Sequence, residues 1–177
     1  MLWTFRAWLF PHSFFHIPTP MSRRLNILSH TYFNLCKDLY ICFMHIPPEN
    51  SSYSIKSRDQ FEVLVIDLSW YSARGDTLLC GDCNARTGTD LDFDTNVTVS
   101  IYYTYDNQYI ADGISCIRNN MDKVRCSRGK SLLELGIQSR LRIRNGRSFG
   151  DTMGRFTPHC SLGSNVIDYF IASEDIR

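Results

Sequence analysis

Two carboxylates and one amide lie where their side chains could act on a phosphate ester. Asp82 and Asn84 follow a short apolar run at 77–81, and Asp168 lies inside another at 165–172. A carboxylate within an apolar strand is costly unless it is paired, hydrogen-bonded or coordinated. Phosphodiester hydrolysis needs an activated water and groups that stabilise charge on the phosphate. We expect Asp82 to align a water and Asn84 to bind phosphate, while Asp168 either caps backbone amides or orients a catalytic group.

Strand and helix signals place these residues at the edge of a sheet. An apolar run at 39–46 ends at Pro47 and indicates a buried strand. Ser57 and Gln60 form a capping box, and the helix that follows has apolar residues at helical spacing up to Tyr71. Gly75 marks the end of that helix, just before the strand at 77–81. This strand–helix–strand unit is typical of an α/β fold.

The second half of the chain contains further helix and strand signals. Ser127 is the expected N-cap of a second helix, and 141–145 alternates apolar with basic residues, which predicts a half-exposed strand with Arg142 and Arg144 on one face. Short strands are expected from Phe156 and at 165–172. The region 82–120 is expected to be mostly loop, with a possible strand at 97–103 and a solvated acidic stretch at 90–94.

Charge is unevenly distributed along the chain, although the net charge is only +1. Acidic residues gather in 82–112 and basic residues in 118–155. An acidic site beside a basic segment suits a metal-assisted phosphodiesterase, and two solvated faces of opposite sign are the alternative. The arginines that we expect to contact nucleic acid are Arg86, Arg142, Arg144 and Arg147.

The cysteines and the N-terminal residues indicate the compartment. The chain has 7 cysteines, an odd number that favours reduced thiols in the nucleus or cytoplasm. Cys80 and Cys83 form a Cys-x-x-Cys pair without a second pair at zinc-finger spacing. Arg6 and Pro11 interrupt the aromatic-rich start, which lacks the apolar core of a signal peptide and is too short to span a bilayer. No membrane contact is expected, with a weak surface anchor as the alternative.

Several stretches resemble, in the same order and at similar separations, the endonuclease/exonuclease/phosphatase domain encoded by non-LTR retrotransposons. The most specific is Gly-Asp-Cys-Asn-Ala-Arg-Thr-Gly at 81–88, and the others are 46–52, 127–135, 141–150 and 163–175. The resemblance covers 39–177 and leaves 1–38 as an atypical N-terminal segment and linker. It implies an α/β fold, the partial DNase I-like sandwich of two sheets with outer helices.

The resemblance also implies roles for individual residues. Asp82 would position or deprotonate the attacking water, Asn84 would contact the scissile phosphate, and Asp168 would support a catalytic histidine. The implied activity is nicking of DNA that depends on Mg²⁺ or Mn²⁺.

Departures from the family pattern indicate a truncated and inactive member. Residues 1–38 contain no Glu to serve as the family's metal ligand, and its Ser-Asp-His motif does not occur before Arg177. His45 stands where the family often has Tyr, and an alternative site built on His45 beside Asp82 is conceivable. His159 is expected to be a surface or packing residue.

Other functions are compatible with the same sequence. The chain could be a non-catalytic nucleic-acid-binding fragment that uses the basic segment 118–155, through phosphate contacts that weaken with salt. It could also be a remnant without a selected role. A half sandwich exposes an apolar sheet face, so we expect poor solubility or a protein partner that covers the missing half.

Overall fold

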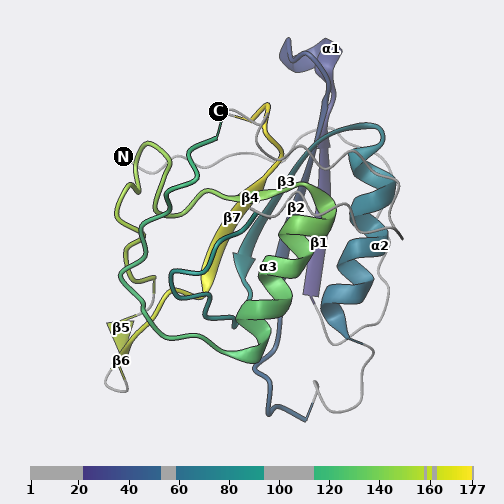
Figure 1. Cartoon of the computed structure of the whole chain (residues 1–177). Helices are drawn as coiled ribbons and strands as arrows, with labels where there is room; N and C mark the ends of the chain where they lie inside the picture. Colours follow the sequence, from purple (N-terminus) through teal and green to yellow (C-terminus); the bar gives the residue numbers. More distant parts are fainter. Residues whose placement is uncertain (1–21, 53–58, 94–113, 158, 161–162, 177) are drawn as a thin grey trace, which may run out of the picture.

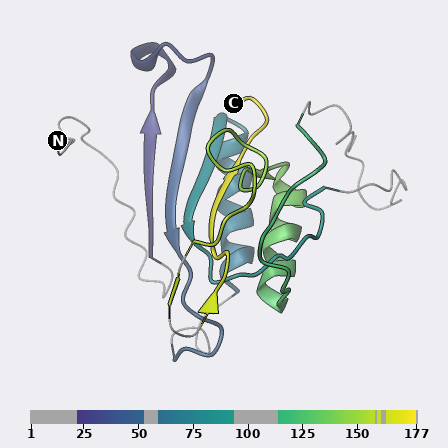
Figure 2. The same ribbon diagram turned by 90° about the vertical axis from the view of Figure 1, so that its left-hand side faces the viewer.

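The protein has a mixed α/β fold in which helices pack on one face of a sheet of five strands (Figures 1 and 2). The computed structural model describes residues 22–52, 59–93, 114–157, 159–160 and 163–176. The strand order in the sheet is β1-β2-β3-β7-β4, and a separate hairpin pairs β5 with β6. The possible strand at 97–103 lies outside the described residues.

The sheet combines one parallel pair with antiparallel neighbours. Strand β2 runs parallel to β3, and all other neighbouring strands are antiparallel. The strands are β1 (Ser22–Leu28), β2 (Asp38–His45), β3 (Gly75–Asp82), β4 (Arg142–Ile143), β5 (His159–Cys160), β6 (Gly163–Ser164) and β7 (Asp168–Ala172). The strands predicted at 39–46, 77–81 and 165–172 are thus confirmed as β2, β3 and β7. Residues 22–28, expected as linker, form β1 and pair with β2 along their whole length.

Two longer helices and one short helix complete the fold of the described residues. Helix α2 (Gln60–Ser72) connects β2 to β3, α3 (Ser127–Ser139) precedes β4, and α1 (His30–Phe33) lies between β1 and β2. The Asp59 side chain caps α2 by accepting the Phe61 N–H at 2.9 Å. The N-cap of α3 is Cys126, whose sulfur accepts the Gly129 N–H, so the expected cap Ser127 is instead the first helical residue.

The hydrophobic core lies between the two long helices and one face of the sheet. Leu64 and Leu68 of α2 pack with Leu132 of α3 against strand residues such as Leu79 and Ile171, all almost fully buried. Removing this apolar surface from water is the main force that holds helices and sheet together. The same packing fixes the ends of β2, β3 and β7, where the predicted site residues lie.

Two expectations about the surface are wrong. Arg142 is 1% exposed and Ile143 is equally buried, so β4 is not the half-exposed strand with outward arginines that the alternation predicts. Asp92, expected in a solvated loop, is also 1% exposed.

Phe156, where a short strand was expected to begin, is outside every strand of the described structure. None of the described helices is long and apolar enough to cross a membrane.

Candidate functional site

Three ionisable residues stand side by side at one edge of the sheet. His45 of β2 is the register partner of Asp82 in β3, and Asp82 is in turn the partner of Asp168 in β7. Register partners on neighbouring strands present their side chains to the same face. His45 Nε2 lies 3.8 Å from Asp82 Oδ2, with exposed side-chain fractions of 56% and 29%. We call His45, Asp82 and Asp168 the edge row.

The loop after β3 is shaped by its own side chains. Asp82 Oδ1 accepts the backbone N–H of Asn84 at 2.8 Å, which closes an Asx turn. Asn84 has φ 44, a left-handed conformation that Asn tolerates better than most residues. A Cβ on Gly81 would approach Met44 O to 2.0 Å, so only Gly fits between β3 and β2 there. These constraints explain the Gly-Asp-x-Asn order locally.

Asn84 is already engaged with the neighbouring strand. Its Nδ2 donates to Ile46 O at 2.8 Å, just beyond the end of β2. The amide that the resemblance assigns to the phosphate therefore also holds the loop against β2. A phosphate contact would use the second N–H of the Asn84 side-chain amide or would follow a small shift of the loop.

Burial is the main reason that the pKa of the Asp82 carboxyl is raised. The hydrogen bond from the Asn84 N–H works in the opposite direction, negative charge on Asp168 raises the pKa further, and His45 lowers it. Two carboxylates held next to each other disfavour simultaneous ionisation. A perturbed carboxyl at a strand end is a common property of functional sites.

Backbone contacts hold Asp168 at the start of β7. Thr157 Oγ1 accepts the Asp168 N–H at 3.3 Å, and Asn145 Nδ2 donates to Asp168 O at 3.1 Å. These bonds fix the strand end and leave the carboxylate in the edge row. The structure thus brings Asp82 and Asp168 together beside His45, with Asn84 in the adjoining turn.

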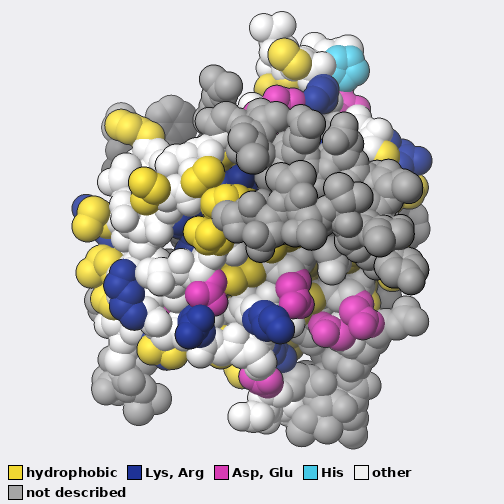
Figure 3. Space-filling view, in the orientation of Figure 1, with side chains coloured by type: hydrophobic (Ala, Val, Ile, Leu, Met, Phe, Trp, Pro, Cys, Tyr) yellow, Lys and Arg dark blue, Asp and Glu magenta, His cyan; other side chains and the backbone are white. Residues whose placement is uncertain are grey.

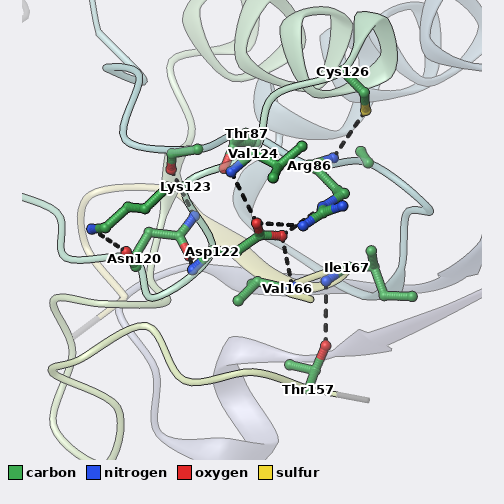
Figure 4. A network of polar contacts seen from close by, with 12 residues as sticks. Arg86, Thr87, Asn120, Asp122, Lys123, Val124, Cys126, Thr157, Val166 and Ile167 are labelled. Carbon is green, nitrogen blue, oxygen red and sulfur yellow. Dashed lines mark hydrogen bonds and ion pairs between the residues drawn. The ribbon is translucent and has the colours of Figure 1, made fainter. Parts of the chain in front are cut away.

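Asp122 is a buried acid that binds Arg86 in the loop that follows β3. Asp122 accepts two hydrogen bonds of 2.7 Å from Nε and Nη2 of Arg86, and backbone N–H bonds from Val124 and Val166 (Figure 4). Burial opposes ionisation of Asp122, but these donors outweigh it and lower the pKa of the carboxyl. The Asp122 side chain is only 2% exposed, so this bidentate pair is largely shielded from water.

Asp92 is a buried acid shared by two other arginines. Its carboxylate accepts bonds of 2.8 and 3.0 Å from Arg147, lies 3.5 Å from Arg142 Nε, and accepts the Ile143 N–H at 2.8 Å. The side chains of Arg142, Arg147 and Asp92 are 1%, 3% and 1% exposed. We call Asp92 and Asp122, with the arginines that they bind, the buried ion-pair network.

The arginines expected to contact nucleic acid are therefore engaged within the chain. Arg86 binds Asp122, Arg142 and Arg147 bind Asp92, and Arg144 donates to Ser173 O at 2.6 Å. Arg142 and Arg147 have almost no exposed surface to offer a DNA phosphate, whereas Arg86 is 32% exposed beside its pair. No local sequence signal points to the network, because its partners are far apart along the chain.

The exposed cations of the basic segment are partly matched by acids. Arg125 pairs with Asp90, and Lys130 with Glu134. Basic and acidic side chains accordingly lie interspersed on the face seen in Figure 3. The exposed cations in 118–155 are Lys123, Arg125, Lys130, Arg140 and Arg155.

The donor groups at the sheet edge fall short of those that the expected Mg²⁺ or Mn²⁺ needs. Within the described residues, no three His, Cys, Asp or Glu side chains converge to hold an ion. The edge row offers two carboxylates, and one of them is already hydrogen-bonded and faces a histidine. The row therefore does not fit a preformed metal site.

The cysteines whose side chains are described are free thiols, and they are Cys36, Cys42, Cys80, Cys83, Cys116 and Cys126. Cys80 and Cys83, the Cys-x-x-Cys pair, are both buried. Burial is the main cause of the raised pKa of each thiol. The side chain of His159 is outside the described residues, so its expected surface or packing role stays a prediction.

Comparisons with known proteins found no match among protein-family models, curated proteins or solved structures.

Proposed function

We propose that the chain is part of an endonuclease/exonuclease/phosphatase domain of the non-LTR retrotransposon type, and that its sheet edge binds a DNA phosphate without cleaving DNA. The observation that supports the family assignment is the meeting of Asp82, Asp168 and Asn84 at one edge. The Asn84 amide is the group among them that can donate to a phosphate oxygen. The proposal of inactivity rests on the edge row, where no three ligating side chains of the described residues converge on an ion and one carboxylate is already hydrogen-bonded. The two-sheet DNase I-like arrangement belongs to the same proposal, and the Mg²⁺ or Mn²⁺ site of the family would be incomplete at this edge.

Plasmid nicking together with DNA binding tests this proposal. Purified wild-type protein and Asp82→Ala are incubated with supercoiled plasmid and Mg²⁺ or Mn²⁺, and we expect no nicking by either. Duplex binding is measured by fluorescence anisotropy, and Asn84→Ala is expected to weaken it. Metal-dependent nicking that disappears in Asp82→Ala would show an active enzyme and contradict the proposal of inactivity.

Binding through the basic segment is the second candidate function. It is favoured by the exposed cations Lys123, Arg140 and Arg155. Phosphate contacts by these side chains would release counterions, so affinity would fall steeply with salt. The variant Arg155→Glu should then reduce the salt dependence of binding, whereas Asn84→Ala should leave it unchanged. Weaker binding by Asn84→Ala, with the salt dependence of Arg155→Glu unchanged, would favour the sheet edge.

A further inference from the structure

Strand β1 forms one lateral side of the sheet, and the outer side of this strand is unpaired. All 7 of its residues pair with β2 in a continuous register without a bulge. Within the described residues, no backbone hydrogen bond joins β1 to a strand other than β2, and no described segment lies beyond it in Figure 2. The strand at the opposite side, β4, has only 2 residues. The outer side of β1 is therefore the longer of the two rows of free backbone N–H and C=O groups that the sheet presents.

The hydrophobic core extends to β1 and is not closed there. Leu25 is half-buried, packs against the core and is the register partner of the buried Cys42. Ile27, two residues further along, lies on the same face of the strand and is 41% exposed. A strand paired with the outer side of β1 would cover both side chains. The strand also contains no Pro, a residue that prevents such pairing in many edge strands.

We propose that the outer side of β1 pairs with β1 of a second copy of this chain, so that two sheets of five strands join into one continuous sheet. The two strands run antiparallel about a two-fold axis at Leu25, which meets Leu25 of the second copy. In this register position 22 meets 28, and positions 23 and 24, which are basic in the sequence, meet 27 and 26. Like charges therefore do not stand directly opposite one another.

A second copy is the partner that matches β1 on both sides of the contact. Each copy carries the same unpaired strand, so one antiparallel contact satisfies the outer N–H and C=O groups of both chains. The joined sheet then ends on both sides at β4, which offers only 2 residues to a further strand, so the contact closes as a dimer. The inference goes beyond the proposed function and is independent of it, because the contact leaves the face opposite the helices to the second sheet of the proposed arrangement.

Sedimentation velocity over a range of protein concentrations tests the proposal, and the wild-type protein is expected to shift from monomer to dimer. Ile27→Lys should raise the dissociation constant of the dimer roughly tenfold, because it puts a positive charge opposite the basic position 23 in both halves of the contact. Ile117→Lys is the matched control, since Ile117 is 75% exposed in the segment before α3 and its replacement should leave association unchanged. Circular dichroism shows whether both variants are folded.

Amide hydrogen exchange of the wild-type protein locates the contact without a substitution. The outward-facing amides of Ser22–Leu28 should be protected at concentrations where the dimer forms and should exchange faster where the monomer dominates. A wild-type protein that stays monomeric, or a dimer in which the protection of β1 does not change with concentration, would overturn the proposal. A dimer that Phe170→Ala dissociates and Ile27→Lys does not would also overturn it, because the contact would then lie on the sheet face where Phe170 is 56% exposed.

Discussion

The edge row and the buried ion-pair network contain the same kinds of side chain in opposite surroundings. Asp82 lies beside a second acid and its carboxyl has a raised pKa, whereas the pKa of the Asp122 carboxyl is lowered. Asp122 and Asp92 each receive two hydrogen bonds from one guanidinium and at least one more from the backbone. Asp82 receives one backbone hydrogen bond and faces a half-exposed His45.

This difference indicates which charged residues build the fold and which are available to a ligand. A buried acid that is saturated by donors stabilises the ionised form and ties distant segments together. An acid held near a like charge is destabilised in its ionised form, and binding of a ligand or a proton can relieve this repulsion. The network therefore belongs to the scaffold, and the edge row is the place to look for binding.

The largest effect is expected from Asp92→Asn. Losing the carboxylate leaves Arg142 and Arg147 buried without their shared acid, and breaking a buried pair in this way costs about 3–5 kcal/mol. Urea unfolding at neutral pH measures the loss. Asp90→Asn is the control, because Asp90 and Arg125 are 43% and 69% exposed and should contribute less than about 1 kcal/mol. Equal losses in the two variants would show that burial does not strengthen the network.

Asp122→Asn should give a smaller loss that depends on pH. Because the folded-state pKa of Asp122 is lowered, its contribution is present above the unfolded value of about 4 and is lost as the pH falls through the folded value. We expect a cost of about 2–3 kcal/mol at neutral pH, since Arg86 keeps some access to water. Unfolding free energies of both proteins, measured from neutral to acidic pH, should converge in acid. A constant difference would mean that charge is not the cause.

The elements of the fold were largely predictable because their signals are local. The apolar runs of β2, β3 and β7 and the helical spacing in α2 and α3 each extend over only a few residues. The position of Asp82 followed from this, since it comes directly after an apolar strand. Asp168, expected inside the run 165–172, is instead the first residue of β7. Even the proximity of His45 to Asp82 could be expected from the adjacent strand ends.

The buried ion-pair network could not be predicted in the same way. Asp92 binds Arg147 across 55 residues, and Asp122 binds Arg86 across 36. In the sequence, Asp92 is one of several acids in a polar stretch, and Arg142 has the alternating context of an exposed strand. Only the tertiary packing shows that these charges are buried together, which is why the arginines were expected to face nucleic acid.

A third prediction concerns the coupling within the edge row. Asp168→Asn removes a negative charge beside Asp82 and should lower the pKa of the Asp82 carboxyl, while His45→Gln should raise it. An NMR titration of the Asp82 side-chain carboxyl in each variant measures the two shifts. Stability should change little in either case. Shifts in the same direction would show that the two neighbours do not act on Asp82 through their charges.

The smallest effect, and the one opposite in sign to the network variants, is expected from Asp82→Asn. The pKa of the Asp82 carboxyl is higher in the folded than in the unfolded protein. Its contribution to the free energy of unfolding is therefore fully present below the unfolded-state pKa and is lost as the pH rises through the folded-state pKa. Asn removes the charge facing Asp168 yet keeps an Oδ1 that can accept the Asn84 N–H. The free energy of unfolding should therefore rise by about 0.5 kcal/mol at neutral pH. Replacing a residue that serves function rather than stability often stabilises a protein in this way. Thermal unfolding should show the gain near pH 7 and none near pH 3. A loss at pH 7, as expected for Asp122→Asn, would place Asp82 among the residues that hold the fold together and remove the distinction between the two regions.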